Sequence, residues 1–168
     1  FWLIGLSFGL MMVSVAGVMS QLKPRFSDMG FSPLHAMLLV SATALAGALG
    51  KYTWGFFCDH FRPQRVVCFM AMSSAASLIL VLTGQKMVSV MLFVIIYGFS
   101  MGGVLSTYPI VIAHFYGRTA YPYVARFLSL FFALEIIGYP ILGQSYDRFG
   151  SYDFAYGFFV FLNVIAGI

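Results

Sequence analysis

Long apolar stretches alternate along this chain with short polar segments. Apolar residues dominate the stretches 1–21, 33–58, 66–82, 87–114, 124–146 and 154–168. A helix needs roughly 20 apolar residues to cross the hydrocarbon core of a membrane, and most of these stretches reach that length. The segments between them carry Pro, Gly and charged residues that are typical of turns, at 22–31, 59–65, 83–86, 116–122 and 147–153.

Short connections place neighbouring helices antiparallel, so the pattern predicts an all-α membrane protein with six transmembrane helices in one domain over residues 1–168. Ser32 and Pro33 supply an N-cap and a proline at the first position of the second helix. Apolar stretches begin abruptly at Phe1 and stop abruptly at Ile168. We therefore expect a segment of a longer protein, truncated at both ends.

Composition supports a membrane protein and excludes other classes. Of 168 residues, 61% are hydrophobic and only 8% are charged, whereas soluble domains carry roughly 25% charged residues. The mean hydropathy is +0.95. The net charge of +4 comes from residues that lie mostly in short polar segments, where lipid headgroups account for them. No basic run with interleaved aromatic residues is present in the sequence, so we expect no nucleic-acid partner.

A short motif occurs twice. Gly55 and Asp59 form a G-x-x-x-D pattern at the end of the second apolar stretch, and Gly143 and Asp147 repeat it at the end of the fifth. These are equivalent places in helices 1–3 and helices 4–6. Two successive three-helix units cross a membrane in opposite directions. The pattern therefore predicts an inverted 3+3 repeat, as found within each half of a 12-helix transporter.

The first copy extends into a charged segment with Arg62 and Arg65. It resembles the loop signature of the Major Facilitator Superfamily, G-x-x-x-D-R/K-x-G-R/K-R/K, with His60 replacing the first basic residue and Arg62 replacing the second glycine. The resemblance implies the C-terminal six-helix half of such a transporter. It also implies that Asp59, Arg62 and Arg65 form a gating charge network on the cytoplasmic side, the alternative being plain positive-inside anchoring.

A finer resemblance, to the monocarboxylate-porter and oxalate/formate-antiporter branch, covers nearly the whole chain. That branch often opens its second half with F-W and a loop like H-L-x-P-x-x-x-D-x-G-x-S. Here these are residues 1–2 and 21–32, with Gln21 in place of the usual His. Three further branch motifs are G-R-x-x-x-G-x-x-x-D, Y-F-G-R and D-x-x-G-S-Y-x-x-A-F, and they are echoed at 50–59, 115–118 and 147–156.

Lys51 is the first candidate substrate-binding residue. It precedes Asp59 by eight residues, or about 12 Å along a helix, so its charge must face a cavity, a partner or the bundle interior. In the resembled branch this position is usually an Arg that pairs with a substrate carboxylate. Lys keeps the charge without the two-pronged geometry of a guanidinium group. The alternative is a structural lysine whose amine extends to the interface.

Glu135, near the middle of the fifth apolar stretch, is the second candidate substrate-binding residue. Burial raises the pKa of a carboxyl group, so such a residue is able to carry a proton at neutral pH. We consider it a proton carrier or an ion partner of Lys51, with a structural helix–helix contact as the alternative.

Other features are better explained by packing. Gly47, Gly50, Gly98 and Gly102 offer smooth faces for close helix contact, and Gly138-Tyr139-Pro140 predicts a kink. Cys58 and Cys68 are taken as structural. His35, His60 and His114 share no metal-binding spacing, so we expect no metal and no cofactor. The sequence contains no HExxH, GxSxG or paired-Asp motif, and we expect no enzyme.

These observations converge on one functional expectation. We expect a multi-pass protein of the cell membrane that carries a small organic anion, such as a mono- or dicarboxylate, by alternating access. Transport would be driven either by coupling to protons or by exchange for a second anion. Its partners are the membrane lipid and the N-terminal six-helix half of the same transporter. The alternative is a Major Facilitator exporter of another substrate class, such as drugs.

Overall fold

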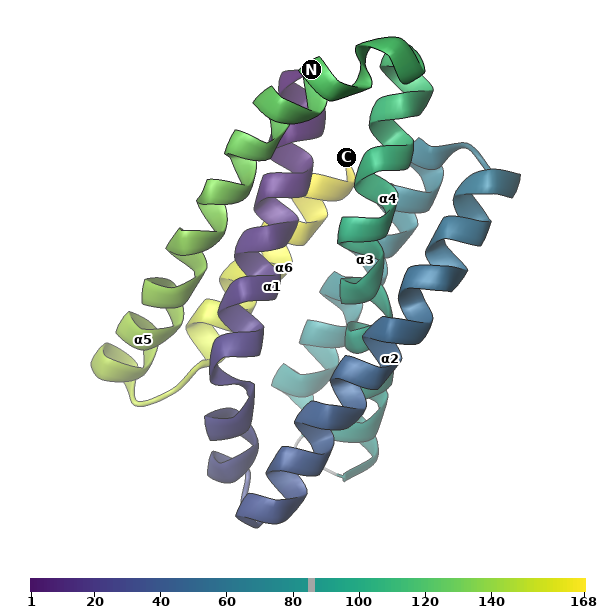
Figure 1. Cartoon of the computed structure of the whole chain (residues 1–168). Helices are drawn as coiled ribbons and strands as arrows, with labels where there is room; N and C mark the ends of the chain where they lie inside the picture. Colours follow the sequence, from purple (N-terminus) through teal and green to yellow (C-terminus); the bar gives the residue numbers. More distant parts are fainter. Residues whose placement is uncertain (85–86) are drawn as a thin grey trace.

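The computed structural model describes residues 1–84 and 87–168, and within these residues it is helical with no strand. Gln85 and Lys86, which the sequence places in a predicted turn, lie outside the described residues. The elements in chain order are α1 (Trp2–Asp28), α2 (Pro33–His60), α3 (Pro63–Thr83), α4 (Met87–Leu128), the 3-10 helix η1 (Ser129–Ile137), α5 (Gly138–Phe149) and α6 (Asp153–Gly167). The predicted all-α class is therefore confirmed (Figure 1).

Four helical segments are long and apolar enough to cross a membrane: α1, α2, α3 and the continuous stretch Met87–Phe149. The apolar helix α6 is shorter. Large apolar side chains also cover much of the surface; Leu45 and Leu49 of α2, for example, are each 68% exposed. Such a surface is unfavourable in water and favourable against lipid tails, which agrees with a multi-pass membrane protein.

The predicted loop at 22–31 is wrong over most of its length, because α1 continues to Asp28. Pro24 lies on the exposed side of the helix, while Leu22 and Phe26 are fully buried. Burial of these two side chains offsets the backbone hydrogen bond that proline cannot donate. The predicted start of the next helix is confirmed, since the Ser32 hydroxyl accepts a hydrogen bond from the backbone N–H of His35 at 3.4 Å.

The predicted break at 116–122 is confirmed at Gly117, where the backbone leaves the helical conformation, although the residues on either side of it are helical and not a loop. Gly117 has φ 77° and ψ 164°, a conformation that is essentially restricted to glycine. Only this residue interrupts the helix, and the chain reverses direction at the top of Figure 1. The tightened 3-10 segment η1 then ends directly before the Gly138-Tyr139-Pro140 sequence, where we predicted a kink.

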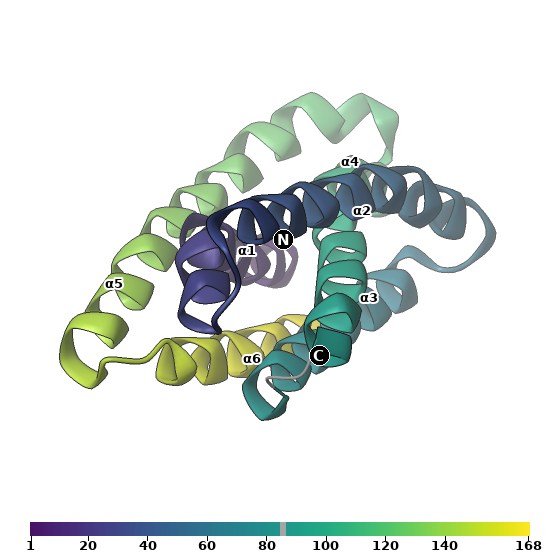
Figure 2. The ribbon, with the colours of Figure 1, turned by 90° about the horizontal axis from the view of Figure 1, so that it is seen from below.

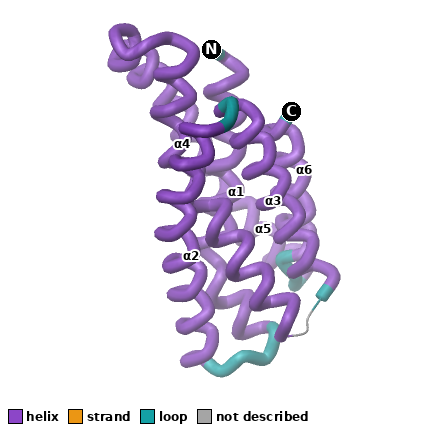
Figure 3. Tube along the Cα trace, turned by 90° about the vertical axis from the view of Figure 1, so that its right-hand side faces the viewer, coloured by secondary structure: helices purple, strands orange, loops and turns teal. Residues whose placement is uncertain are grey.

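Helix packing divides the molecule into two groups. Helix α4 packs on α2 and α3, and α1 packs on η1, α5 and α6, while α3 and α6 join the groups. Figure 2, which looks along the bundle, shows α2, α3 and α4 toward one side and α1, α5 and α6 toward the other. Figure 3 shows that the helices run roughly parallel to one long axis.

Glycines form the tightest contacts in both groups, as the sequence predicted for α2 and α4. A methyl group on Gly102 of α4 would collide with the backbone of Gly47 in α2. In the other group, a methyl group on Gly138 of α5 would collide with the Val13 carbonyl and the Gly17 nitrogen of α1. Backbones that approach this closely gain van der Waals contacts along the whole crossing.

Buried polar side chains connect the groups at the centre of the bundle. Asn163 of α6 donates a hydrogen bond to the hydroxyl of Ser14 in α1 at 2.9 Å. The Tyr97 hydroxyl of α4 donates to the Ser14 carbonyl at 3.2 Å. All three residues are almost completely buried. In an apolar environment these bonds fix the relative position of α1, α4 and α6.

Candidate functional site

Lys51 lies on the exposed surface of α2, nine residues before the helix ends at His60. The buried face of α2 consists of Ala36, Leu39, Thr43, Gly47, Gly50, Trp54 and Cys58. Lys51 directly follows Gly50, so it projects from one flank of that buried face. Among the described residues no hydrogen bond or ion pair satisfies its amine. The ammonium is therefore available to a partner outside this set of residues.

Glu135 lies in η1, where its side chain is half-buried. The structure does not join it to Lys51, because α2 packs on α4 whereas η1 packs mainly on α1. Within residues 1–84 and 87–168 the single ion pair is formed by Arg25 and Asp153. The idea that Glu135 is an ion partner of Lys51 thus finds no direct contact to support it, while a proton-carrying role stays a prediction.

The expected gating residues gather at one end of the bundle. Gly55 and Asp59 are in the last turns of α2, Arg62 precedes α3, and Arg65 is in its first turn. The three charged side chains are exposed, and no ion pair connects them in the described part of the chain. Their gating role therefore stays a prediction.

A hollow beside Asp59 brings it together with His114 and Arg118 of α4. The hollow has a volume of about 550 Å³ and is lined by Asp59, Pro109, Ile110, Ala113, His114, Arg118 and Tyr121. Arg118 follows the Gly117 turn, so the end of α2 and the turn in α4 face the same space. The sequence places Arg118 in the predicted segment 116–122 and in the motif echoed at 115–118, but it does not show that this segment lies next to Asp59.

The second copy of the motif lies at the other end of the bundle. Gly143 and Asp147 are in α5, and Asp147 is exposed near the end of this helix. In Figure 1 the end of α5 is at the bottom, opposite the end of α2 that carries Asp59. A methyl group on Gly143 or Gly55 would have no other atom within 4 Å, so neither glycine is required for close helix contact here.

Arg25 forms a second polar centre, at the same end as Asp147. Its guanidinium donates a hydrogen bond to Asp153 at 2.9 Å and lies 5.5 Å from the centre of the Tyr156 ring. Arg25 is only 9% exposed. Nearby, the pKa of Tyr152 is raised, first by burial and then by the negative charge of Asp28. Sequence patterns did not indicate this centre, because Arg25 was expected in a loop.

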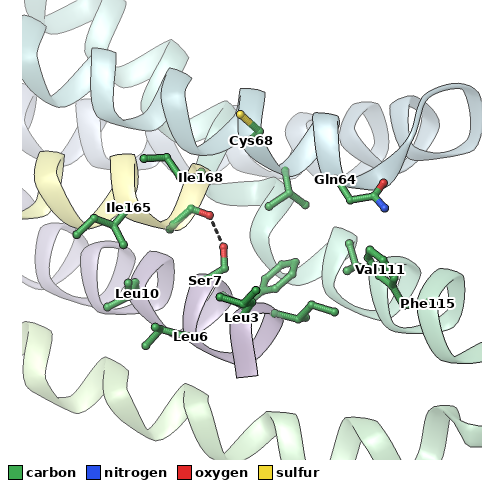
Figure 4. A pocket seen from close by; sticks show the side chains of 15 residues that line it. Leu3, Leu6, Ser7, Leu10, Gln64, Cys68, Val111, Phe115, Ile165 and Ile168 are labelled. Atoms are coloured by element: carbon green, nitrogen blue, oxygen red, sulfur yellow. Dashed lines mark hydrogen bonds between the residues drawn. The ribbon is translucent and has the colours of Figure 1, made fainter. Parts of the chain in front are cut away.

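An apolar pocket of about 260 Å³ lies between α1, α3, α4 and α6 (Figure 4). Leu3, Leu6, Leu10, Val111 and Ile165 form much of its wall. The Ser7 hydroxyl, the nearest polar group on α1, donates a hydrogen bond to the Ala166 carbonyl. Gln64 is the other polar side chain that lines the pocket, and no charged side chain lines it, so this pocket is a poor candidate for an anion site.

The described residues contain no group of three or more His, Cys, Asp or Glu side chains that could hold a metal ion. Cys58 and Cys68 are both free thiols. No protein-family model matches the chain, and no curated protein matches it significantly.

Proposed function

We propose that the chain is a six-helix half of a secondary transporter of the Major Facilitator type, carrying a small organic anion by alternating access. The N-terminal six-helix half of the same transporter would be its partner, and the cell membrane its location. The observation that carries the proposal is the paired arrangement of the helices.

The packing is consistent with an inverted 3+3 repeat. If α1 to α3 form one unit, and the helices after α3 form the other, α4 corresponds to α1, the η1–α5 segment to α2, and α6 to α3. If the two three-helix units are swapped in this way, the contact of α2 with α4 corresponds to the contact of η1–α5 with α1. The contact of α3 with α4 likewise becomes that of α6 with α1, and all four contacts are present. Inverted repeats of this kind form the halves of many transporters.

The repeated motif supports the same correspondence between the two three-helix units. The two G-x-x-x-D copies end α2 and α5, and these helix ends lie at opposite ends of the bundle. An inverted repeat requires this placement, since the second unit runs through the membrane in the opposite direction. The exposed Asp59, Arg62 and Arg65 would then contact the partner half on one side and act in gating.

Lys51 supports an anionic substrate. A charged side chain within an apolar helix is costly, by about 2.5–3.5 kcal/mol on insertion scales, and it is kept where it serves a pathway or a partner. Lys51 is exposed on this bundle with no partner in the described residues. A carboxylate between the two halves would pair with its ammonium, and Glu135 would carry a proton or contribute to binding.

A second candidate keeps the fold and changes the substrate. An apolar hollow of about 670 Å³ lies between the start of α1 and the segment containing Phe127, Leu130, Phe131 and Leu134. Such a wall suits a hydrophobic compound better than a small carboxylate. In this case Glu135 would recognise a cationic group, and Lys51 would be structural.

The test uses the full-length parent protein in proteoliposomes. Uptake of a panel of labelled small carboxylates is compared between the native protein and Lys51→Gln, with Lys23→Gln as a control because Lys23 is exposed near the end of α1. We expect Lys51→Gln to abolish uptake and Lys23→Gln to preserve it. Normal uptake by Lys51→Gln, or no uptake of any carboxylate by the native protein, would remove the anion proposal.

A further inference from the structure

The side chain of Trp54 in α2 connects this helix to α4 by a hydrogen bond. This side chain is 2% exposed, and the indole N–H donates a hydrogen bond to the Phe99 carbonyl of α4 at 2.8 Å. The indole also packs against the Phe99 ring, with centroids 5.4 Å apart. It is a directional contact between the two helices, in addition to the glycine contacts at their crossing.

Two glycines make room for this contact. A methyl group on Gly103 would collide with the Met70 sulfur and come within 2.5 Å of the indole Cδ1 atom, so only glycine leaves space for the ring at this position of α4. A methyl group on Gly50 would collide with the Phe99 carbonyl, the same group that accepts the indole hydrogen bond. The indole is therefore held both by its hydrogen bond and by the space that these glycines leave.

Lys51 lies between Gly50 and Trp54 in the sequence and on the flank of the buried face that they share. Each residue turns an α-helix by about 100°, so a modest rotation of α2 would move Lys51 toward α4 or out to the opposite, fully exposed side. The glycine contacts limit such a rotation, because a side chain brought to the place of Gly50 would collide with the Phe99 carbonyl of α4. The Trp54 hydrogen bond opposes it, because the indole N–H must stay directed at one carbonyl.

We infer that Trp54 is a positioning residue that fixes the rotation of α2 and thereby directs Lys51 to the proposed anion site. The inference rests on the proposed function for the role of Lys51, whereas the control of its direction by Trp54 is a separate structural statement. Trp54 itself is buried and does not touch the substrate. Its substitution should weaken anion binding and leave the later steps of transport largely intact.

The first experiment measures which way positions 51 and 46 of α2 face, and it needs no transport assay. Single cysteines are placed at Lys51 and at Ala46, which lies on the other flank of α2 against Gly98, in a background lacking other reactive cysteines. Their rates of modification by a water-soluble maleimide are compared in detergent, with native Trp54 and with Trp54→Phe. Thr53→Val is the control, because it removes the bond from the Thr53 hydroxyl to the Leu49 carbonyl within α2 itself.

We expect Trp54→Phe to lower the modification rate at position 51 and raise it at position 46, each by several fold, with Thr53→Val changing neither. Unchanged rates would overturn the inference, and so would an increase at both positions, which indicates general loosening. If Trp54→Phe does not yield a monodisperse protein, Gly103→Ala displaces the indole by a different route and should change the two rates in the same directions.

The second experiment measures transport by variants that retain Lys51. We expect Trp54→Phe to raise KM for the transported carboxylate about tenfold while kcat stays within about twofold, and Thr53→Val to change neither. An equal loss in kcat would indicate a merely structural role and contradict the inference. If Lys51→Gln transports normally, the anion site fails as a proposal and the functional half of this inference falls with it. The cysteine rates still decide whether Trp54 directs position 51.

Discussion

Arg25 and Asp153 are joined by a hydrogen-bonded ion pair of 2.9 Å that connects the last turn of α1 to the first turn of α6. Arg25 is almost buried, with an 11% exposed side chain, whereas the side chain of Asp153 is 59% exposed. The arginine also faces the ring of Tyr156. One side chain from the first helix therefore organises the end of the bundle where the last helix begins.

Replacing Asp153 with Asn should destabilise this end, because it leaves the charge of Arg25 without a carboxylate. The cost should be about 1 kcal/mol, below that of a fully buried pair since Asp153 is largely in solvent. Thermal unfolding in detergent measures the effect. Asp28→Asn is the matched control, as Asp28 is an exposed carboxylate at the same end with no ion pair in the described residues. Equal melting temperatures for the two variants would contradict the prediction.

Adding one methyl group to Gly102 should separate α2 from α4. The methyl group would meet the backbone of Gly47, which has no flexible side chain that could move away. Overpacking of this kind costs about 1–3 kcal/mol, and we expect Gly102→Ala to lower the melting temperature in detergent. Gly157→Ala provides the comparison, since a methyl group there has no neighbour within 4 Å. Equal loss of stability in both variants would show that helix contact is not the cause.

The sequence predicted the helical class and several boundaries, because apolar length and capping residues are local signals. Ser32 and Pro33 identify the start of α2 without any knowledge of its neighbours. The error at 22–31 has a different origin. Pro24 is a turn signal in isolation, but burial of Leu22 and Phe26, with the pairing of Arg25, keeps this segment helical. Contacts between distant residues decide this region, and one sequence does not reveal them.

In the candidate site, too, some features follow from local sequence and others depend on contacts between helices. The position of Asp59 at a helix end follows from local pattern, whereas the exposure of Lys51, which we expected to face a cavity, a partner or the bundle interior, does not. The shared hollow of Asp59 and Arg118, or the bond from Trp54 to Phe99, depends on which helices are neighbours. Glycine spacing in α2 and α4 did indicate close contact. It did not identify the tryptophan that fixes the rotation of one helix on the other.

Gly117 should be the least replaceable residue of the turn that it forms. Its φ of 77° with a ψ of 164° is strained for every residue with a side chain, although a methyl group at this position would have no neighbour within 4 Å. Gly117→Ala should cost about 1–3 kcal/mol through backbone strain alone. Chemical unfolding in detergent measures this loss. Thr119→Ala, two residues further along an exposed part of the same segment, should have little effect.

Tyr152 should contribute a pH-dependent part of the stability. Burial, followed by the charge of Asp28, raises its pKa above the ordinary value of 10.0. The folded state therefore binds the phenolic proton more tightly than the unfolded state. This contribution is fully present below pH 10 and is lost as the pH rises through the folded-state pKa. Tyr152→Phe should lose less stability than the native protein as the pH rises above about 10. Parallel loss of stability in the two proteins would refute this expectation.

Glu135 provides the test of proton coupling. The residue is half-buried in η1 with no ion pair in the described residues, so its carboxyl group is not already committed to a cation. If this group carries the coupled proton, Glu135→Gln should remove the stimulation of carboxylate uptake by an inward proton gradient while leaving exchange of labelled for unlabelled carboxylate active. Exchange needs no net proton movement, so it shows that the variant is folded and binds its substrate. Glu135→Asp, which keeps a titratable group, should retain part of the stimulation. Gradient-stimulated uptake that is equal in Glu135→Gln and the native protein would assign this glutamate to helix packing instead.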